Sequence, residues 1–192
     1  MNRTPTRKSQ RSKKVSPGKA GRNLTTRVKT ARGRKQSSTK WLQRQLNDPY
    51  VAAARRIGLR SRAAYKLEDL DNKFRFLKPN MRVIELGAAP GGWTQVLVNR
   101  LCTEKTGSKS KVIAIDLQEM VPVNGAEILQ LDFMSNNAVK IIKQALGGNA
   151  DAILSDMAPK FTGHPATDHM RIINLTEAAY DLAKEVLAPG GC

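Results

Sequence analysis

The 192-residue sequence has only two cysteines, Cys102 and Cys192, and neither belongs to a C-x-x-C pair. It therefore suggests neither a disulfide framework nor a zinc site. No apolar run is long enough to span a bilayer, and no hydrophobic signal region is present, which argues against secretion and membrane insertion. These absences favour a cytoplasmic protein without a membrane partner.

Acidic residues are absent from the first 40 positions, although 14 of the 33 lysines and arginines lie there. That segment carries +14 of the formal net charge of +17, whereas the 19 basic and 16 acidic residues of 41–192 nearly balance. A cationic segment with few apolar residues cannot bury enough surface to fold alone, but it can neutralise phosphates and release their counterions. We therefore predict that residues 1–40 form a disordered basic arm that binds RNA.

A mitochondrial transit peptide is the alternative for this arm, because such peptides are also rich in arginine and serine and poor in acids. The stretch from Lys8 to Lys14 offers no apolar helix face, however, and this disfavours a transit peptide. The RNA-binding arm is the preferred interpretation.

Residues 41–60 combine several large apolar side chains with four arginines and a single acid, and they predict a basic helical collar. From residue 61 onward, apolar residues recur at helical spacing, at Ala64, Leu67, Leu70 and Phe74. We predict that these four side chains form the buried face of a helix. The same position begins the predicted domain, residues 61–192.

Short apolar runs alternate with helical patterns in the rest of this domain. Strands are expected at 82–86, 111–115, 127–131 and 151–155, and helices at 93–101, 136–146 and 169–187. Continuous apolar strands separated by helices are typical of a parallel sheet covered on both faces. The sequence thus predicts an α/β fold with a doubly wound, mostly parallel sheet.

An aspartate ends or follows three of the four expected strands, at Asp116, Asp132 and Asp156. Doubly wound sheets bind their ligands at the carboxyl ends of strands. A single aspartate at such a place is more often a turn residue or a helix cap. Three of them beside a glycine-rich loop favour a ligand-binding role.

The loop Gly87–Gly92 follows the first expected strand and holds three glycines and a proline. It differs from G-x-G-x-x-G and lacks the lysine with which a P-loop holds phosphate. The expected ligand is therefore a nucleoside without a polyphosphate, such as S-adenosylmethionine. The same difference disfavours a dinucleotide-dependent oxidoreductase.

Three segments together, Ser61–Leu67 (SRAAYKL), Leu86–Gln95 (LGAAPGGWTQ) and Leu154–Pro159 (LSDMAP), resemble the RrmJ/FtsJ-type ribosomal RNA ribose 2′-O-methyltransferases. The resemblance covers about residues 41–192. It implies a Rossmann-like fold, S-adenosyl-L-methionine as methyl donor, and methylation of a uridine 2′-hydroxyl in large-subunit ribosomal RNA during subunit maturation. The implied partner is that RNA within the assembled 50S-type subunit, and we expect the enzyme to be a monomer.

The resemblance also implies which residues hold the cofactor. Gly91 and Trp93 would line the pocket around the methionine and sulfonium. Asp116 would bind the ribose hydroxyls of the adenosine, and Asp132 its adenine amino group. Asp156 would form the floor near the transferable methyl group.

Lys66 and Asp156 match the first two members of the Lys-Asp-Lys-Glu catalytic tetrad of that family. Without the resemblance, a lone lysine on an amphipathic helix would be interpreted as a solvated surface residue. The second lysine and the glutamate would lie beyond Cys192. We therefore expect a C-terminally incomplete domain that lacks its last strands and transfers methyl groups barely or not at all. A catalytically dead protein that binds RNA and cofactor is the alternative function.

His164 and His169 are the only histidines, and Asp168 is the only acid near them. This set is too small to predict a metal site, and we expect none. We expect the loop 160–169 to contact RNA or to close over the ribose.

Overall fold

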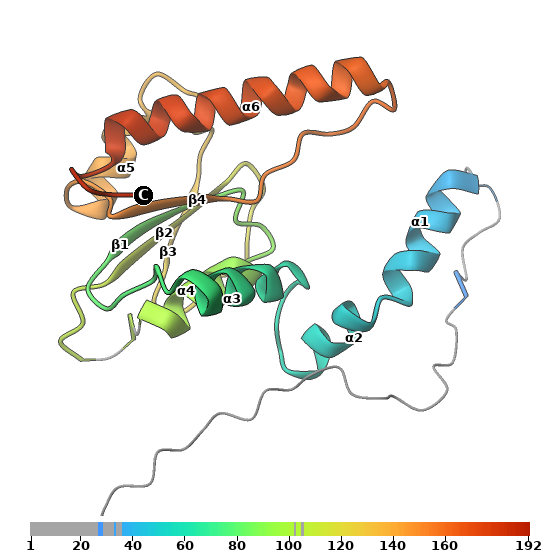
Figure 1. Ribbon diagram of the computed structural model, residues 1–192, viewed down its shortest axis with the longest axis horizontal. Coiled ribbons are helices and arrows are strands. Elements are labelled where there is room, and N and C mark those ends of the chain that lie inside the picture. Colours follow the sequence, from blue (N-terminus) through green and yellow to red (C-terminus); the bar gives the residue numbers. More distant parts are fainter. Residues whose placement is uncertain (1–26, 29–32, 34–35, 102, 105) are drawn as a thin grey trace, which may run out of the picture. The chain divides into compact units, whose positions relative to one another are not determined.

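The computed structural model describes residues 27, 28, 33, 36–101, 103, 104 and 106–192 (Figure 1). Most of the arm predicted for residues 1–40 lies outside the described residues. The chain divides into two compact units, residues 1–53 and 54–192. No helix among the described residues is long and apolar enough to cross a membrane.

Two short helices occupy most of the predicted collar. Helix α1 spans Gln36–Leu46 and therefore begins inside the predicted arm, whereas α2 spans Pro49–Arg56. The Asp48 carboxylate accepts the backbone N–H of Tyr50 at 2.8 Å, and proline occupies the first position of α2. An aspartate cap followed by proline is a favoured helix start, because both dispose of backbone N–H groups that would otherwise lack partners.

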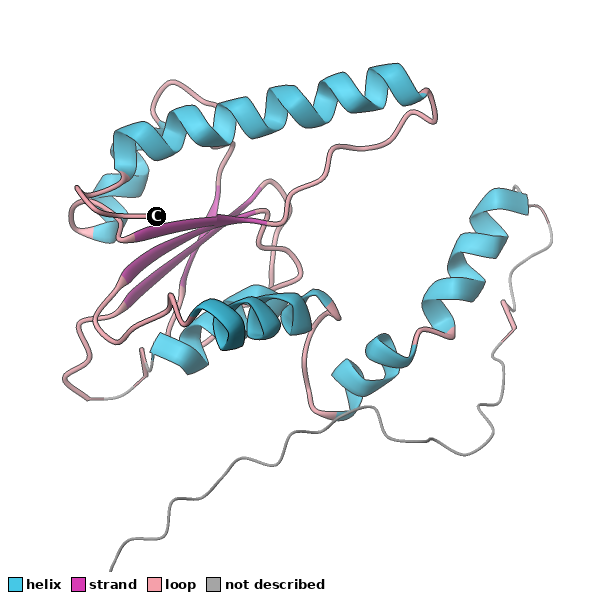
Figure 2. Ribbon diagram, viewed as in Figure 1, coloured by secondary structure: helices cyan, strands magenta, loops and turns pink. Residues whose placement is uncertain are grey.

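The unit 54–192 is built on a four-stranded parallel sheet with the strand order β3-β2-β1-β4. Its strands are β1 (Arg82–Leu86), β2 (Lys111–Asp116), β3 (Glu127–Gln130) and β4 (Ala152–Ser155). Its helices are α3 (Ala63–Phe74), α4 (Gly92–Leu101), α5 (Ala138–Leu146) and α6 (Pro165–Val186). Helices α3 and α4 cover one face of the sheet and α5 and α6 the other (Figure 2). The predicted α/β fold with a parallel sheet is confirmed.

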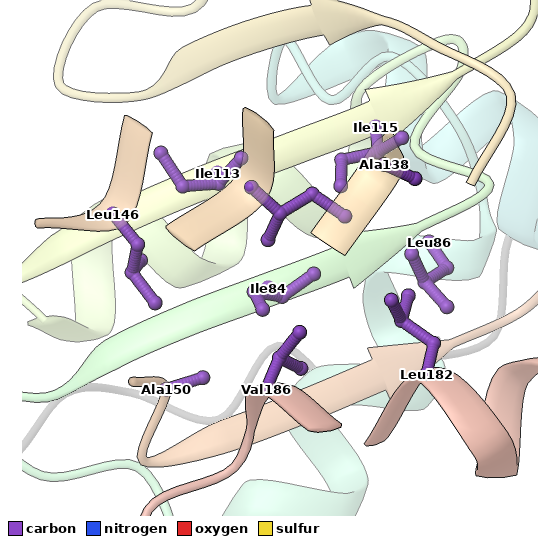
Figure 3. Close-up of a cluster of buried hydrophobic side chains, with 10 residues drawn as sticks. Ile84, Leu86, Ile113, Ile115, Ala138, Leu146, Ala150, Leu182 and Val186 are labelled. Carbon is purple, nitrogen blue, oxygen red and sulfur yellow. The ribbon is translucent and has the colours of Figure 1, made fainter. Parts of the chain in front are cut away.

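Side chains along the central strands point alternately to the two faces of the sheet, so the core has a part on each face. Ile84 and Leu86 of β1 point toward α5 and α6, together with Ile113 and Ile115 of β2 (Figure 3). Val83 and Val112, which precede the first isoleucine of each strand, pack with α3 and α4 instead. Because strand side chains alternate in direction, a strand covered on both faces must be apolar at nearly every position.

Helix α3 departs from the predicted apolar face. Ala64 and Leu67 are fully buried, but Leu70 is 43% and Phe74 62% exposed. Asp71 takes the next place on the buried face, where its carboxylate accepts the backbone N–H of Leu77 at 3.0 Å. The expected burial of Leu70 and Phe74 is therefore wrong, because the packing stripe follows residues 64, 67 and 71.

Helix α6 begins at Pro165, earlier than predicted, so half of the loop expected at 160–169 is helical. The Asp168 carboxylate explains this start. It accepts the hydroxyl and the backbone N–H of Thr162, both at 2.7 Å, and the N–H of Gly163 at 3.0 Å. These hydrogen bonds, that of the Thr162 hydroxyl first, hold the pKa of Asp168 below its usual value.

Strand β4 forms the end of the sheet order opposite β3. The backbone of Cys192 lies beside it, accepting the N–H of Ile153 at 2.9 Å and donating to the carbonyl of Asp151 at 3.1 Å. An isolated parallel bridge also joins Ala150 to Leu187.

Leu67 and Leu70 offer a matched test of the α3 packing. Leu67→Ala should lower the free energy of unfolding by about 2–5 kcal/mol, because it removes a buried side chain and leaves a cavity. Leu70→Ala should change it by less than about 1 kcal/mol, because that side chain is half exposed. Urea unfolding followed by circular dichroism measures both. Equal losses would show that both leucines lie in the core.

Candidate active site

The register of the sheet brings three chain segments to one edge. Leu86 of β1 pairs with Ile115 of β2 on one side and with Ser155 of β4 on the other. The residues that follow these three positions are Gly87, Asp116 and Asp156. They therefore meet at the carboxyl edge of the sheet, where doubly wound folds bind ligands.

The glycine-rich loop folds tightly over this edge. The carbonyl of Ile115 accepts the N–H groups of both Gly87 and Ala88, at 2.9 and 3.1 Å. Gly87 and Gly91 have φ angles of +76° and +102°, which other residues rarely adopt. A side chain at Gly87 would also collide with Met157, the residue after Asp156. Glycine therefore lets the loop backbone approach the end of β4.

Asp116 fastens the glycine-rich loop to the end of β2. One carboxylate oxygen accepts the N–H of Ala89 at 2.8 Å and the other accepts the N–H of Gln118 at 2.8 Å. Each oxygen can accept a further hydrogen bond from a ligand hydroxyl. The position predicted to hold ribose hydroxyls thus lies directly against the loop.

Lys66 and Asp156 lie 90 residues apart in the chain, yet the fold brings them into contact. The Lys66 ammonium group, from α3, lies 2.9 Å from Asp156 Oδ1 and 3.3 Å from Oδ2 at the end of β4. Their side chains are 63% and 35% exposed. An exposed ion pair contributes little to stability, so its position at the ligand edge matters more for chemistry than for folding.

Glu85 is a third carboxyl group at this edge, and the sequence interpretation gave it no role. It is 2% exposed on β1 and accepts a hydrogen bond from the Thr94 hydroxyl at 2.7 Å. Burial raises its pKa to about 7 against the opposing effect of the hydrogen bonds with Thr94, and the charges of Asp116 and Asp156 add smaller increases. A charged residue within the apolar run RVIEL was the signal available in the sequence.

Trp93 and Asp132 lie in less direct positions. The Trp93 indole is buried among Val83, Val96 and Leu97, and its N–H donates to the carbonyl of Ala63 at 2.7 Å. Any contact of Trp93 with a cofactor would therefore be made by its backbone, at the start of α4. Asp132 is exposed after β3, and its carboxylate accepts the N–H of Met134 at 2.9 Å.

No three histidine, cysteine, aspartate or glutamate side chains gather as metal ligands in the part of the chain that the structure describes. The His164 ring lies 3.3 Å from the Thr167 hydroxyl, and His169 lies within α6.

Glu85 gives the protein a testable pH dependence. Its folded pKa of about 7 exceeds the ordinary value of 4.5, so its contribution to stability is full below pH 4.5 and is lost as pH rises through 7. Glu85→Gln cannot ionise and can still accept from Thr94. Relative to the native protein, the variant should therefore gain stability between pH 5 and pH 8, by up to about 3 kcal/mol.

Urea unfolding at the two pH values measures this gain, with Glu177→Gln, an exposed position on α6, as the control. Parallel pH profiles for the native protein and Glu85→Gln would contradict a raised pKa.

Comparison with known proteins gives a consistent result. The family model for FtsJ-like methyltransferases matches residues 59–192. The chain is 58% identical over 181 residues to ribosomal RNA large subunit methyltransferase E of Jannaschia sp. (strain CCS1), covering 93% of this chain and 76% of that protein. It is 57% identical to the protein of the same name from Paramagnetospirillum magneticum, covering 91% and 72%.

A solved structure from Plasmodium falciparum, described as a ribosomal RNA methyltransferase, superposes with a TM-score of 0.60 at 33% sequence identity. The superposition covers 67% of this chain and 72% of the other. The family model, the close relatives and the geometry of the sheet edge agree. The chain belongs to the FtsJ-like methyltransferase family.

Proposed function

We propose that this protein transfers a methyl group from S-adenosylmethionine to the 2′-hydroxyl of a uridine ribose in large-subunit ribosomal RNA. The observation that carries the proposal is the Lys66–Asp156 pair, which lies at the same sheet edge as the glycine-rich loop and Asp116. Family membership supports the reaction class, and the large-subunit ribosomal RNA methyltransferases among the relatives support the substrate. We further propose a cytoplasmic monomer that acts on the assembled subunit.

The residues at the β1 and β2 ends fit this cofactor. The backbone of the loop Gly87–Gly92 can approach a cofactor closely, and the loop has no lysine to bind phosphate. Asp116 offers carboxylate oxygens to ribose hydroxyls. Gly91, the Trp93 backbone and Asp132 are the remaining proposed contacts. When bound, S-adenosylmethionine supplies a methyl group on a positively charged sulfonium. The carboxylates of Asp116 and Asp156 and the carboxyl of Glu85 suit a cationic ligand at this edge.

Lys66 and Asp156 would serve the acceptor end of the reaction. Displacement at a methyl group requires the attacking oxygen to lie in line with the departing sulfur, so orientation of the ribose is a large part of catalysis. The ion pair holds an exposed ammonium donor and a carboxylate acceptor in fixed relation. We assign these two groups the binding and alignment of the ribose hydroxyl.

The charge distribution supports a polyanionic substrate. The first 40 residues hold 14 lysines and arginines without one acid, and α1 and α2 add Arg44, Arg55 and Arg56. Neutralising phosphates releases condensed counterions, which gives affinity without sequence preference. Selection of one uridine would then rest on the site and on the shape of the RNA.

Asp116→Asn tests the proposed cofactor contact. An amide oxygen can still accept the Ala89 N–H, but the charge is lost. Binding of S-adenosylmethionine, measured by isothermal titration calorimetry, should weaken by about 1–3 kcal/mol. Asp69→Asn on the exposed face of α3 is the control. Unchanged affinity in the Asp116 variant would exclude this residue from the cofactor site.

Lys66→Met tests the proposed reaction. Any methyl transfer by the native protein to large ribosomal subunits that lack this modification should be about 100-fold slower in the variant in single turnover, because the ribose is misaligned. Cofactor affinity should be retained. Lys73→Met, on an exposed part of the same helix, should behave as the native protein. Binding of cofactor and RNA by the native protein without any transfer would instead favour the non-catalytic alternative.

A further inference from the structure

The side chain of Arg60 joins three segments of the chain. Its Nη1 donates to the carbonyl of Val121 at 2.5 Å, and its Nη2 donates to that of Pro122 at 2.6 Å. Nη1 also lies 3.4 Å from the carbonyl of Pro90 in the glycine-rich loop. A guanidinium thus connects the loop after β2 with the loop after β1.

The backbone around Arg60 is anchored separately from its guanidinium. The Gln95 side chain, on α4, accepts the Arg60 N–H at 2.9 Å and donates to the carbonyl of Gly58 at 3.1 Å. Leu59 packs against the core beneath α4. Helix α4 therefore fixes the backbone from which the Arg60 side chain extends. The guanidinium can then act as a clamp between the two loops.

The glycine-rich loop is shaped to accept this clamp. A side chain built on Gly91 would place its Cβ 2.8 Å from Arg60 Nη1 and 3.1 Å from Met120 Sδ. Gly91 therefore leaves room for the guanidinium on one side and for the loop after β2 on another. This is a second reason, besides its φ of +102°, for glycine at this position.

The segment that Arg60 holds forms the wall of a cavity. Asp116 begins this segment, Met120 is its buried side chain and Val121 is 73% exposed. A cavity of about 340 Å³ lies between it and β3, lined by Glu119, Met120, Pro122, Ala126, Ile128 and Gln130. This volume falls at the lower end of the range for small-molecule sites. Its lining comes from the loop that follows Asp116 and from β3 with the residue before it.

We infer that Arg60 is a positioning residue that fixes the loop Leu117–Pro122 against the glycine-rich loop and thereby sets the affinity for the cofactor. The inference rests on the proposed function in taking S-adenosylmethionine as the ligand. Hydrogen bonds from a charged guanidinium to two carbonyls are stronger than neutral ones. Lysine cannot replace them fully, because it lacks the planar fork that reaches two acceptors at once.

Three variants test the inference: Arg60→Ala, Arg60→Lys, and the control Arg75→Ala at the exposed end of α3. Loss of charged hydrogen bonds should weaken S-adenosylmethionine binding at least 10-fold in Arg60→Ala and less in Arg60→Lys. Transfer at saturating cofactor and the KM for ribosomal subunits should stay near native values. In the protein without cofactor, the backbone N–H groups of residues 117–121 and 123 should exchange hydrogen faster in Arg60→Ala than in Arg75→Ala.

A raised KM for ribosomal subunits with native cofactor affinity would overturn the inference and make Arg60 an RNA contact. Native amide exchange at 117–123 in both Arg60 variants would also overturn it. The exchange measurement needs no cofactor, so it distinguishes failure of the clamp from failure of the proposed function. Should Arg60→Ala not fold, Arg60→Lys decides the question, because it keeps the charge and loses only the fork.

Discussion

The parallel pairing of β1 with β2 on one side and with β4 on the other is the constraint on which the site depends. Parallel strands end at the same edge, so the residue after each strand is placed by register alone. Gly87, Asp116 and Asp156 meet for this reason, although they are spread over 70 positions of the chain. A shift of one residue in either pairing would reverse the faces of that strand and separate these groups. The buried isoleucines of β1 and β2 oppose such a shift, because their alternation fits only one register.

The same edge concentrates acidic groups that would repel one another if all were ionised. Burial of Glu85 relieves part of this repulsion, because its raised pKa keeps much of it protonated near neutral pH. Lys66 relieves another part by pairing with Asp156. The site thus keeps Asp116 and Asp156 available to ligands, and a cationic ligand would add to this balance. Glu85 is buried and Asp156 is paired with a lysine, so the two carboxyl groups differ in charge state. Such differences are expected where neighbouring acids perform different functions.

The sequence predicts most of this fold, because apolar runs of four to six residues between helical segments leave few other arrangements. The predicted β1 matches its observed bounds, and Asp116 and Asp156 fall at the ends of β2 and β4 as expected. Strand β3 ends at Gln130, so Asp132 lies two residues beyond it rather than directly after it. The face of α3 was predicted less well. Counting apolar residues favoured Leu70 and Phe74, whereas the helix buries Asp71, whose partners become visible only in three dimensions.

The site residues differ in how readily a sequence reveals them. The contact between Lys66 and Asp156 could be expected only from a family resemblance, because nothing local to either residue predicts it. Glu85 could have been noticed as a charge within a buried strand. Arg60 could not, because the acceptors of its guanidinium are backbone carbonyls, which any residue type supplies. Contacts to backbone carbonyls cannot be predicted from the identity of the residues that carry those carbonyls.

The glycine-rich loop connects the two halves of the proposed reaction. On the cofactor side its Ala89 N–H is held by Asp116, whereas on the acceptor side Gly87 lies against Met157, next to Asp156. Transfer requires donor and acceptor to be aligned within a fraction of an ångström. If separate loops held them, the positional variations of the two loops would add. Here the carboxylates of Asp116 and Asp156 both lie beside the same short loop, whose backbone hydrogen-bonds to the Ile115 carbonyl. A change in the backbone of that segment would therefore disturb binding and alignment together, whereas changes at either flank can disturb one without the other.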